Sequence, residues 1–197
     1  AVLIEAVALL RAQGCEVDLQ IAGTGPDTEK LQQQIQRLQL QKHIALLGFV
    51  QDMDGFYQQC DVFVCPSIWE SYGLVAIEAF AAGLPVVGAN TDGLPEVVSD
   101  GVNGVCVAPS WDSASYTSAM QETASFANEV SYQAEQDALM AQKSLSPYDL
   151  AGAIKSLLNH SEQYHQMSVA ALQAASDIKS YQQLADAVIC SVKEACK

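Results

Sequence analysis

Short apolar runs alternate with segments of helical periodicity along the first half of the chain. Apolar residues that recur every three or four positions predict helices, which cover residues 2–13, 27–38, 53–59 and 74–82. Continuous apolar runs of a few residues predict strands, which cover residues 17–22, 44–47, 61–65, 84–88 and 104–107. Strands and helices that alternate at this spacing indicate an α/β fold built on a parallel sheet.

The turns that follow these strands should lie together. Right-handed crossovers place the carboxyl ends of parallel strands on one edge of a sheet, where such folds bind their ligands. The turns at Gly23, Gly48, Pro66 and Asn90 are therefore expected to line one crevice. The Gly23-x-Gly25 turn is weak support for phosphate binding by itself, because many such turns only lead the chain out of a strand.

The pattern changes over residues 110–146. This segment is polar, rich in Ala, Gln, Glu and Ser, and shows no strand signal. It is predicted to be an insertion of helices that forms a solvated excursion. Ser146-Pro147 then opens a helical tail, with helices predicted over 150–159, 162–176 and 181–197. The chain is interpreted as one domain, 1–197, with this insertion and the C-terminal helices 147–197.

The stretch from Pro66 to Pro85 carries the candidate chemistry. A strand there leads through a loop into the start of a helix, and such a start presents unpaired backbone N–H groups and the positive end of the helix dipole. Both features favour phosphate. The residues whose N–H groups are expected to meet it are Ser71, Tyr72, Gly73, Leu74 and Val75.

Two carboxylates bracket that helix start. Glu78 is the one charged residue of a helix that is apolar nearly all round and is therefore predicted to be buried. A buried carboxylate needs partners, so Glu78 either bonds to backbone or a neighbouring hydroxyl, or it accepts hydrogen bonds from a ligand diol such as a ribose. Glu70 lies in the loop, where it is either a solvated side chain or a ligand contact.

These residues carry a family resemblance. Glu70-x7-Glu78 follows Pro66-Ser67 and leads into Glu-Ala-x-Ala-x-Gly-x-Pro-Val-Val, which resembles the donor-site signature of group 1 (family 4) retaining glycosyltransferases. Further segments that resemble the family are 21–26, 47–50, 93–98 and 100–107. The resemblance runs over about 1–108 and resumes at about 146.

The resemblance implies the C-terminal, donor-binding half of a GT-B fold: a Rossmann-like parallel sheet with helices on both faces. It implies transfer of a sugar from a nucleotide-diphosphate sugar to an acceptor with retention at the anomeric carbon. Glu78 would hold the ribose hydroxyls, and Glu70 would face the donor sugar and act in catalysis. The N–H groups of residues 71–75 would meet the diphosphate, and Val50 and Asp52 would lie near the base.

The same resemblance implies a partner domain and no cofactor. The nucleotide sugar is a substrate, and the second Rossmann-like domain of the GT-B fold would supply acceptor contacts. No Lys or Arg occurs between Lys42 and Lys143, so the cations that meet the diphosphate are expected upstream of Ala1. The chain has no initiator Met and begins within a predicted helix, which indicates a fragment.

Composition excludes several other classes. Of 197 residues, 50% are hydrophobic and 16% charged, which favours a packed core over disorder. The net charge of −14 argues against nucleic acid and anionic lipid as partners, and no apolar run has membrane-spanning length. The six cysteines form no C-x-x-C pair, so no metal or disulfide framework is predicted, and free thiols favour the cytoplasm. Any membrane contact would fall to the other half.

Two alternatives of other classes stay open. One is a module that binds a nucleotide sugar without turnover, and the other is a nucleotide-sugar epimerase of the same fold. The Glu70-x7-Glu78 spacing after Pro66-Ser67 favours a transferase over an epimerase. An upstream second Rossmann-like half would decide against the binding module.

Overall fold

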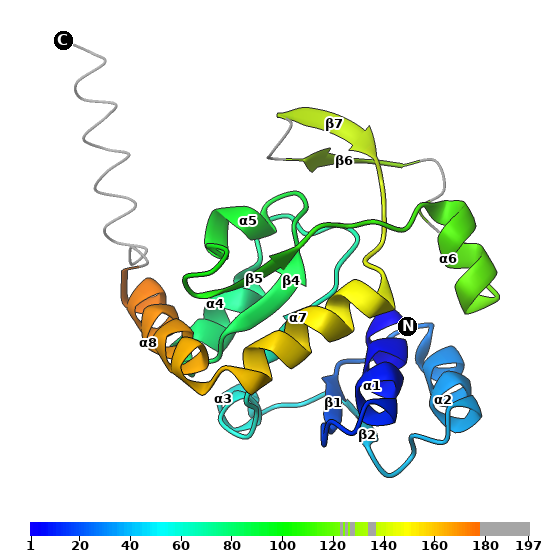
Figure 1. Cartoon of the computed structure of the whole chain (residues 1–197), viewed down its shortest axis with the longest axis horizontal. Coiled ribbons are helices and arrows are strands. Elements are labelled where there is room, and N and C mark those ends of the chain that lie inside the picture. Colours follow the sequence, from blue (N-terminus) through cyan, green and yellow to red (C-terminus); the bar gives the residue numbers. More distant parts are fainter. Residues whose placement is uncertain (123, 125, 127–128, 134–136, 178–197) are drawn as a thin grey trace.

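The alternation of strands and helices that the hydrophobic pattern predicts is present in the computed structural model (Figure 1). The structure describes residues 1–122, 124, 126, 129–133 and 137–177. The elements in chain order are α1 (Val2–Ala12), β1 (Leu19–Ala22), α2 (Thr28–Arg37), β2 (Ile44–Gly48), α3 (Met53–Tyr57), β3 (Phe63–Cys65), α4 (Leu74–Ala81), β4 (Val86–Ala89), α5 (Leu94–Val97), β5 (Gly104–Val107), α6 (Ser113–Met120), β6 (Val130–Gln133), β7 (Ala138–Ala141), α7 (Pro147–Asn159) and α8 (Ser161–Asp177). The helix predicted over 181–197 lies outside the described residues.

The first five strands pair in parallel, as predicted, but they form two sheets rather than one. β1 pairs with β2, and β3, β4 and β5 pair in that order. In register, Ile21 lies opposite Leu46, and Val87 lies opposite Val105. No pairing joins β1 to β3 among the described residues.

Helices cover both faces of the β3-β4-β5 sheet, as the fold class requires. Val87 and Ala89 of β4 pack in one cluster with residues of α1 and α7. Val86, the neighbour of Val87, faces the opposite side and packs with residues of α4 and α8, among them Phe80. Successive strand residues point to opposite faces, so β4, which is buried throughout, reads in the sequence as one continuous apolar run.

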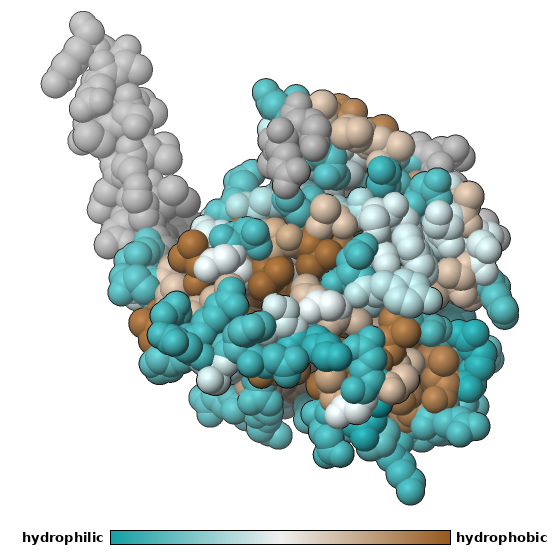
Figure 2. All heavy atoms as spheres, viewed as in Figure 1, coloured by the Kyte–Doolittle hydropathy of each residue, from teal (hydrophilic) through white to brown (hydrophobic). Residues whose placement is uncertain are grey.

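The insertion is not all helical, which corrects the prediction. It contains α6, but it also contains an antiparallel hairpin in which β6 pairs with β7. The two strands have four residues each, and runs of that length are too short to show a strand period in a polar sequence. The hairpin exposes Val130 and Leu139, and Figure 2 shows apolar atoms along the edge of the molecule where β7 lies.

Helix α4 begins and ends close to the predicted positions, but it is not buried all round. Ala76, Ala79 and Phe80 are almost fully buried, whereas Leu74 is 65% exposed and Val75 is 38% exposed. Glu78 also lies on the exposed side. The periodicity of an all-apolar helix gives no indication of which side faces solvent, and here the exposed side includes the helix start.

The burial of the cysteines and the length of the helices bear on the remaining sequence predictions. Cys65 is buried in the core, and Cys106 is partly buried. Cys190 and Cys196 lie outside the described residues. Within the described part of the chain, none of the helices combines the length and the hydropathy that a membrane span requires.

The asymmetry of α4 gives a test on one helix. Phe80→Ala should lower the free energy of unfolding by about 3–5 kcal/mol, because it empties a buried aromatic site. Leu74→Ala should change it by less than about 0.5 kcal/mol, because that side chain is mostly in solvent. Urea denaturation followed by circular dichroism measures both. Equal losses in the two variants would show that the assigned burial of α4 is wrong.

Candidate functional site

The loop between β3 and α4 enters its helix through a glycine. Gly73 is the N-cap residue and has φ of +88°, a left-handed conformation that glycine adopts without the steric cost other residues meet. A Cβ at this position would also lie 2.9 Å from Cδ1 of Leu94. The predicted strand–loop–helix geometry therefore depends on glycine at residue 73.

Glu70 is held by the loop that it belongs to. Its Oε1 accepts a hydrogen bond from the backbone N–H of Gly73 at 3.1 Å, and its backbone carbonyl accepts one from the N–H of Gly93 at 3.0 Å. The side chain is half-buried. Glu70 thus has a capping role that the sequence did not indicate, and the carboxylate remains partly open to solvent beside the helix start.

The first turn of α4 is open to solvent. Ser71, Tyr72, Leu74 and Val75 are exposed, and the first N–H groups of a helix lack carbonyl partners within it. Gly73 differs from its neighbours, because it is buried and its N–H is bonded to Glu70. The predicted contact of the remaining N–H groups with a phosphate stays a prediction.

Glu78 has a partner from another helix. The hydroxyl of Tyr57, at the end of α3, donates to Oε2 of Glu78 at 3.0 Å. Burial, followed by this hydrogen bond and the charge of Glu78, raises the pKa of Tyr57 well above its usual value, so the phenol stays a donor. The neighbouring hydroxyl that was one of the two possibilities for Glu78 is therefore present. Because Glu78 is exposed, its carboxylate has room for ligand hydroxyls as well.

The predicted base contacts sit at the start of α3. Asp52 is the N-cap of α3, and its Oδ1 accepts a hydrogen bond from the N–H of Gly55 at 2.9 Å. Val50 is half-buried just before it. The capping role of Asp52 was not expected. Contact of Val50 and Asp52 with a base remains a prediction.

Tyr57 and Gly93 are the residues that sequence reasoning missed. A tyrosine in a short apolar helix reads as a core aromatic, and Tyr57 is indeed only 3% exposed. Nothing in the sequence shows where its hydroxyl points. Gly93 follows Asp92, and an Asp-Gly pair does mark a turn, but the turn signal does not reveal its bond to Glu70.

The site is acidic and holds no recognisable metal centre. Glu70 and Glu78 are the charged side chains beside the start of α4, and the described residues contain no cluster of three or more His, Cys, Asp or Glu that could bind a metal ion. The arrangement can accept hydrogen bonds from hydroxyls through its carboxylates and can attract an anion through the α4 N-terminus. It has no side chain placed as a nucleophile with an adjacent base.

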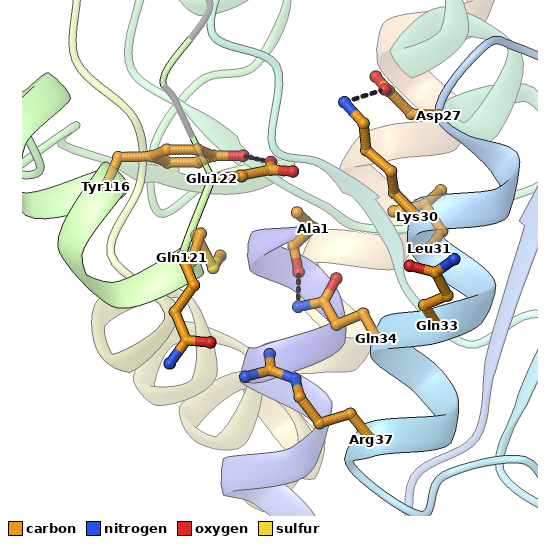
Figure 3. Close-up of a pocket in the computed structure, with 11 residues that line it drawn as sticks. Ala1, Asp27, Lys30, Leu31, Gln33, Gln34, Arg37, Tyr116, Gln121 and Glu122 are labelled. Atoms are coloured by element: carbon orange, nitrogen blue, oxygen red, sulfur yellow. Dashed lines mark hydrogen bonds and ion pairs between the residues drawn. The ribbon is translucent and has the colours of Figure 1, made fainter.

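A cavity of about 340 Å³ lies elsewhere, between α1, α2 and α6 (Figure 3). None of the predicted site residues lines it. Its charged side chains already have partners: Lys30 pairs with Asp27 at 2.8 Å, Arg37 pairs with Glu5 at 2.6 Å, and Glu122 accepts a hydrogen bond from the hydroxyl of Tyr116 at 2.8 Å. Paired charges have less to offer a ligand, so this cavity is a weaker candidate than the α4 start.

The sequence matches the family described as glycosyl transferases group 1 over residues 1–125. That match covers more than half of the chain and includes both glutamates of the loop and helix. The chain belongs to the group 1 glycosyl transferases. The family resemblance drawn from Glu70-x7-Glu78 is confirmed.

The similar proteins are longer than this chain. A glycosyltransferase of Methanocaldococcus jannaschii, MJ1607, described as uncharacterized, is 40% identical over 93 residues, which are 46% of this chain and 24% of that protein. The structure of Anabaena HepE in complex with UDP-glucose superposes with a TM-score of 0.69 at 24% identity, covering 96% of this chain and 44% of that one.

A third comparison fixes which half is present. The C-terminal domain of a group 1 glycosyl transferase from Francisella tularensis superposes with a TM-score of 0.63 at 21% identity, covering 89% of this chain and 76% of that one. The fold prediction, the C-terminal half of a GT-B fold, is confirmed.

The Tyr57–Glu78 pair can be tested by mutation. Glu78→Ala should weaken nucleotide binding by about 1.5–3 kcal/mol, the range for a hydrogen bond to a charged acceptor. Tyr57→Phe should weaken it by less, about 0.5–1.5 kcal/mol, because the carboxylate stays and loses only its orienting donor. Titration calorimetry of the full-length protein with UDP and other nucleoside diphosphates measures both.

The double variant tests whether Tyr57 acts through Glu78, and the melting temperature separates an effect on ligand binding from an effect on folding. If Tyr57 acts only through Glu78, adding Tyr57→Phe to Glu78→Ala should cost no further affinity. Unchanged affinity in Glu78→Ala together with a large fall in melting temperature would contradict the binding role and leave Glu78 as a structural partner of Tyr57.

Proposed function

We propose that this chain is the donor-binding domain of a retaining, hexosyltransferase-type glycosyltransferase that uses a nucleotide-diphosphate sugar. The observation that carries the proposal is the solvent-open start of α4 with a glutamate on each side, Glu70 in the loop and Glu78 one turn into the helix. Family membership and the UDP-glucose bound by the similar HepE structure support the same ligand class.

In this proposal each contact has its own chemistry. The diphosphate lies at the N–H groups of residues 71–75, where the helix dipole adds about 0.3–1 kcal/mol per charge. Glu78, oriented by Tyr57, accepts hydrogen bonds from the ribose diol. Glu70, fixed by Gly73 and Gly93, faces the hydroxyls of the donor sugar. Val50 and Asp52 lie near the base.

The reaction needs no nucleophile from this domain. When the bond between the anomeric carbon and the diphosphate breaks, negative charge grows on the leaving group, and fixed donors and cations stabilise it. The acceptor attacks from the same face, so that the configuration is retained. We assign the acceptor contacts to a second Rossmann-like domain, in keeping with the greater length of the relatives.

The sheet order supports residues upstream of Ala1 as part of the domain. A doubly wound sheet has the order 3-2-1-4-5-6, in which the first strand lies between the second and the fourth. The observed orders, β1-β2 and β3-β4-β5, match that arrangement with one further strand between β1 and β3. A strand there would end at the same edge as the site, where it could bring the cations that residues 43–142 lack.

A binding module without turnover and a same-fold epimerase remain the competing functions. Both would bind the same nucleotide sugar, so binding alone does not separate them from a transferase. Product analysis does, because only a transferase forms a new glycosidic bond to an added acceptor. The free thiols and the absence of a membrane-spanning helix among the described residues are in keeping with our proposal of a cytoplasmic location.

Glu70 tests the catalytic part of the proposal. Glu70→Gln keeps an oxygen that can accept the Gly73 N–H and removes only the charge, so the loop should keep its shape. Turnover should fall by at least about tenfold with little change in donor KM, because the interaction is assigned to the transition state. Steady-state kinetics of the full-length enzyme decides, and an unaltered kcat would exclude this role for Glu70.

The division of labour between domains is tested by truncation. Residues 1–197 alone should bind nucleoside diphosphates weakly and transfer no sugar. Adding roughly 30 upstream residues, about one β-α unit, should recover diphosphate binding, whereas transfer should still require the second domain. Calorimetry and product analysis on the three lengths measure this. Enzyme-like turnover by residues 1–197 would refute both the missing-cation and the two-domain parts of the proposal.

A further inference from the structure

The insertion leaves and rejoins the domain at one point. The N–H of Trp111 donates to the carbonyl of Ser144 at 3.0 Å, and the N–H of Ser144 donates to the carbonyl of Trp111 at 2.8 Å. The described residues between 112 and 143, which belong to the insertion 110–146, therefore extend from a closed base. Their contacts with the rest of the domain can be considered as those of one attached unit.

One contact of this unit is a pair of hydrogen bonds with Asp92, in the loop that follows β4. The N–H of Asp92 donates to the carbonyl of Tyr132 at 2.9 Å, and the N–H of Tyr132 donates to Oδ1 of Asp92 at 2.9 Å. Next to this pair, Nε2 of Gln133 donates to Oγ1 of Thr91 at 3.2 Å. Asp92 thus engages both main-chain groups of Tyr132.

Polar groups, rather than apolar burial, hold the hairpin on that loop. Ser131 is 2% exposed and Gln133 is half-buried, and the two are bonded to each other on the side of Thr91. On the other side of the hairpin, Val130 is 59% exposed and Leu139 is 71% exposed. Loss of one of these hydrogen bonds should therefore measurably weaken the contact between the hairpin and the loop.

Gly93, the residue after Asp92, links the hairpin contact to Glu70. Gly93 donates its N–H to the carbonyl of Glu70 at 3.0 Å, and a Cβ at Gly93 would lie only 2.2 Å from the carbonyl oxygen of Ser71. Asp92 itself has φ of +49°, a left-handed conformation that few residues other than glycine adopt. The bonds to Tyr132 hold Asp92 in this conformation and so fix the direction of the Gly93 N–H.

A second contact lies on the other side of Glu70. Ile68 packs against a buried cluster formed largely by the insertion, in which the rings of Tyr116 and Phe126 meet edge to face at 5.4 Å. The insertion therefore contacts the loop directly at Ile68 and, through Asp92 and Gly93, at Glu70. The two contacts restrain the segment that carries the catalytic carboxylate from both ends.

We propose that the insertion 112–143 is the element that positions Glu70, and that Asp92 is the positioning residue through which the hairpin acts. The inference rests on the proposed function, in which Glu70 contacts the donor sugar, and it adds the element that holds the Glu70 loop in place. The insertion itself contributes no substrate contact. It fixes the loop whose Glu70 faces the donor sugar.

Three variants at left-handed positions test it. Asp92→Gly removes the acceptor of the Tyr132 N–H but tolerates the positive φ, whereas Asp92→Asn keeps an oxygen acceptor and also tolerates it. Asp137→Gly is the matched control, because Asp137 has φ of +47° and accepts the Tyr132 hydroxyl at 2.8 Å at the far end of the hairpin.

Hydrogen exchange of the ligand-free, full-length protein is the first measurement. Peptides over residues 67–73 should exchange about 2- to 10-fold faster in Asp92→Gly, the range for the loss of one net hydrogen bond. They should be unchanged in Asp92→Asn and in Asp137→Gly. Equal exchange in all variants, or equal acceleration in both glycine variants, would overturn the inference.

Kinetics is the second measurement. In Asp92→Gly, kcat should fall about 2- to 10-fold with a smaller change in donor KM, because Glu70 is displaced while Glu78 is not. Asp92→Asn should keep the kcat of the unmodified enzyme, because its side-chain oxygen still accepts the Tyr132 N–H. A kcat loss shared by Asp92→Asn would overturn the hydrogen-bond mechanism. Hydrogen exchange is measured without a nucleotide sugar, so it tests the positioning role independently of the proposed function. If the protein bound no nucleotide sugar, the proposed function would be refuted, and the exchange result would still decide whether the insertion positions Glu70.

Discussion

One main-chain hydrogen bond, from the Gly93 N–H to the Glu70 carbonyl, joins the two loops that form the site. It requires glycine at residue 93, since any side chain would collide with the backbone of Ser71. With its backbone held from outside, Glu70 turns its carboxylate to the N–H of Gly73 at the start of α4. The open first turn of the helix and the carboxylate beside it therefore share one fixed geometry, and this depends on close backbone packing that only a residue without a Cβ allows.

The charge of the domain decides which parts of a ligand it can recognise by itself. Two glutamates and a helix dipole suit a sugar or ribose hydroxyl well and a diphosphate only in part, because a dipole interaction is worth about 2 kcal/mol at most. A net charge of −14 adds a repulsive field for any anion. In the proposed function the domain therefore selects hydroxyl positions, and the affinity for phosphate would come mostly from cations outside residues 43–142.

The sequence predicted the order of the elements, because strand and helix periods and turn residues such as Gly23 and Gly48 are local signals. It also pointed to residues 66–85 as the candidate site segment. It did not predict that α4 exposes Leu74 and Glu78, since an apolar helix carries no mark of which side meets solvent. It also missed the hairpin, whose strands form by pairing rather than by local preference. The partner of the Glu70 carbonyl, Gly93, and the partner of Glu78, Tyr57, are distant in sequence, so no local pattern could reveal them.

In the proposed donor site, helix α3 would couple recognition of the base to recognition of the ribose. Asp52 caps its start and Tyr57, at its end, donates to Glu78. A helix of five residues spans only about 7 Å at 1.5 Å per residue, so a shift of the predicted base loop moves the Tyr57 hydroxyl by a similar amount. A hydrogen bond of 3.0 Å tolerates little such movement before it is lost. The position of the Glu78 carboxylate therefore reports on the loop that precedes α3, and a change of base preference in that loop would be expected to alter the ribose contact as well.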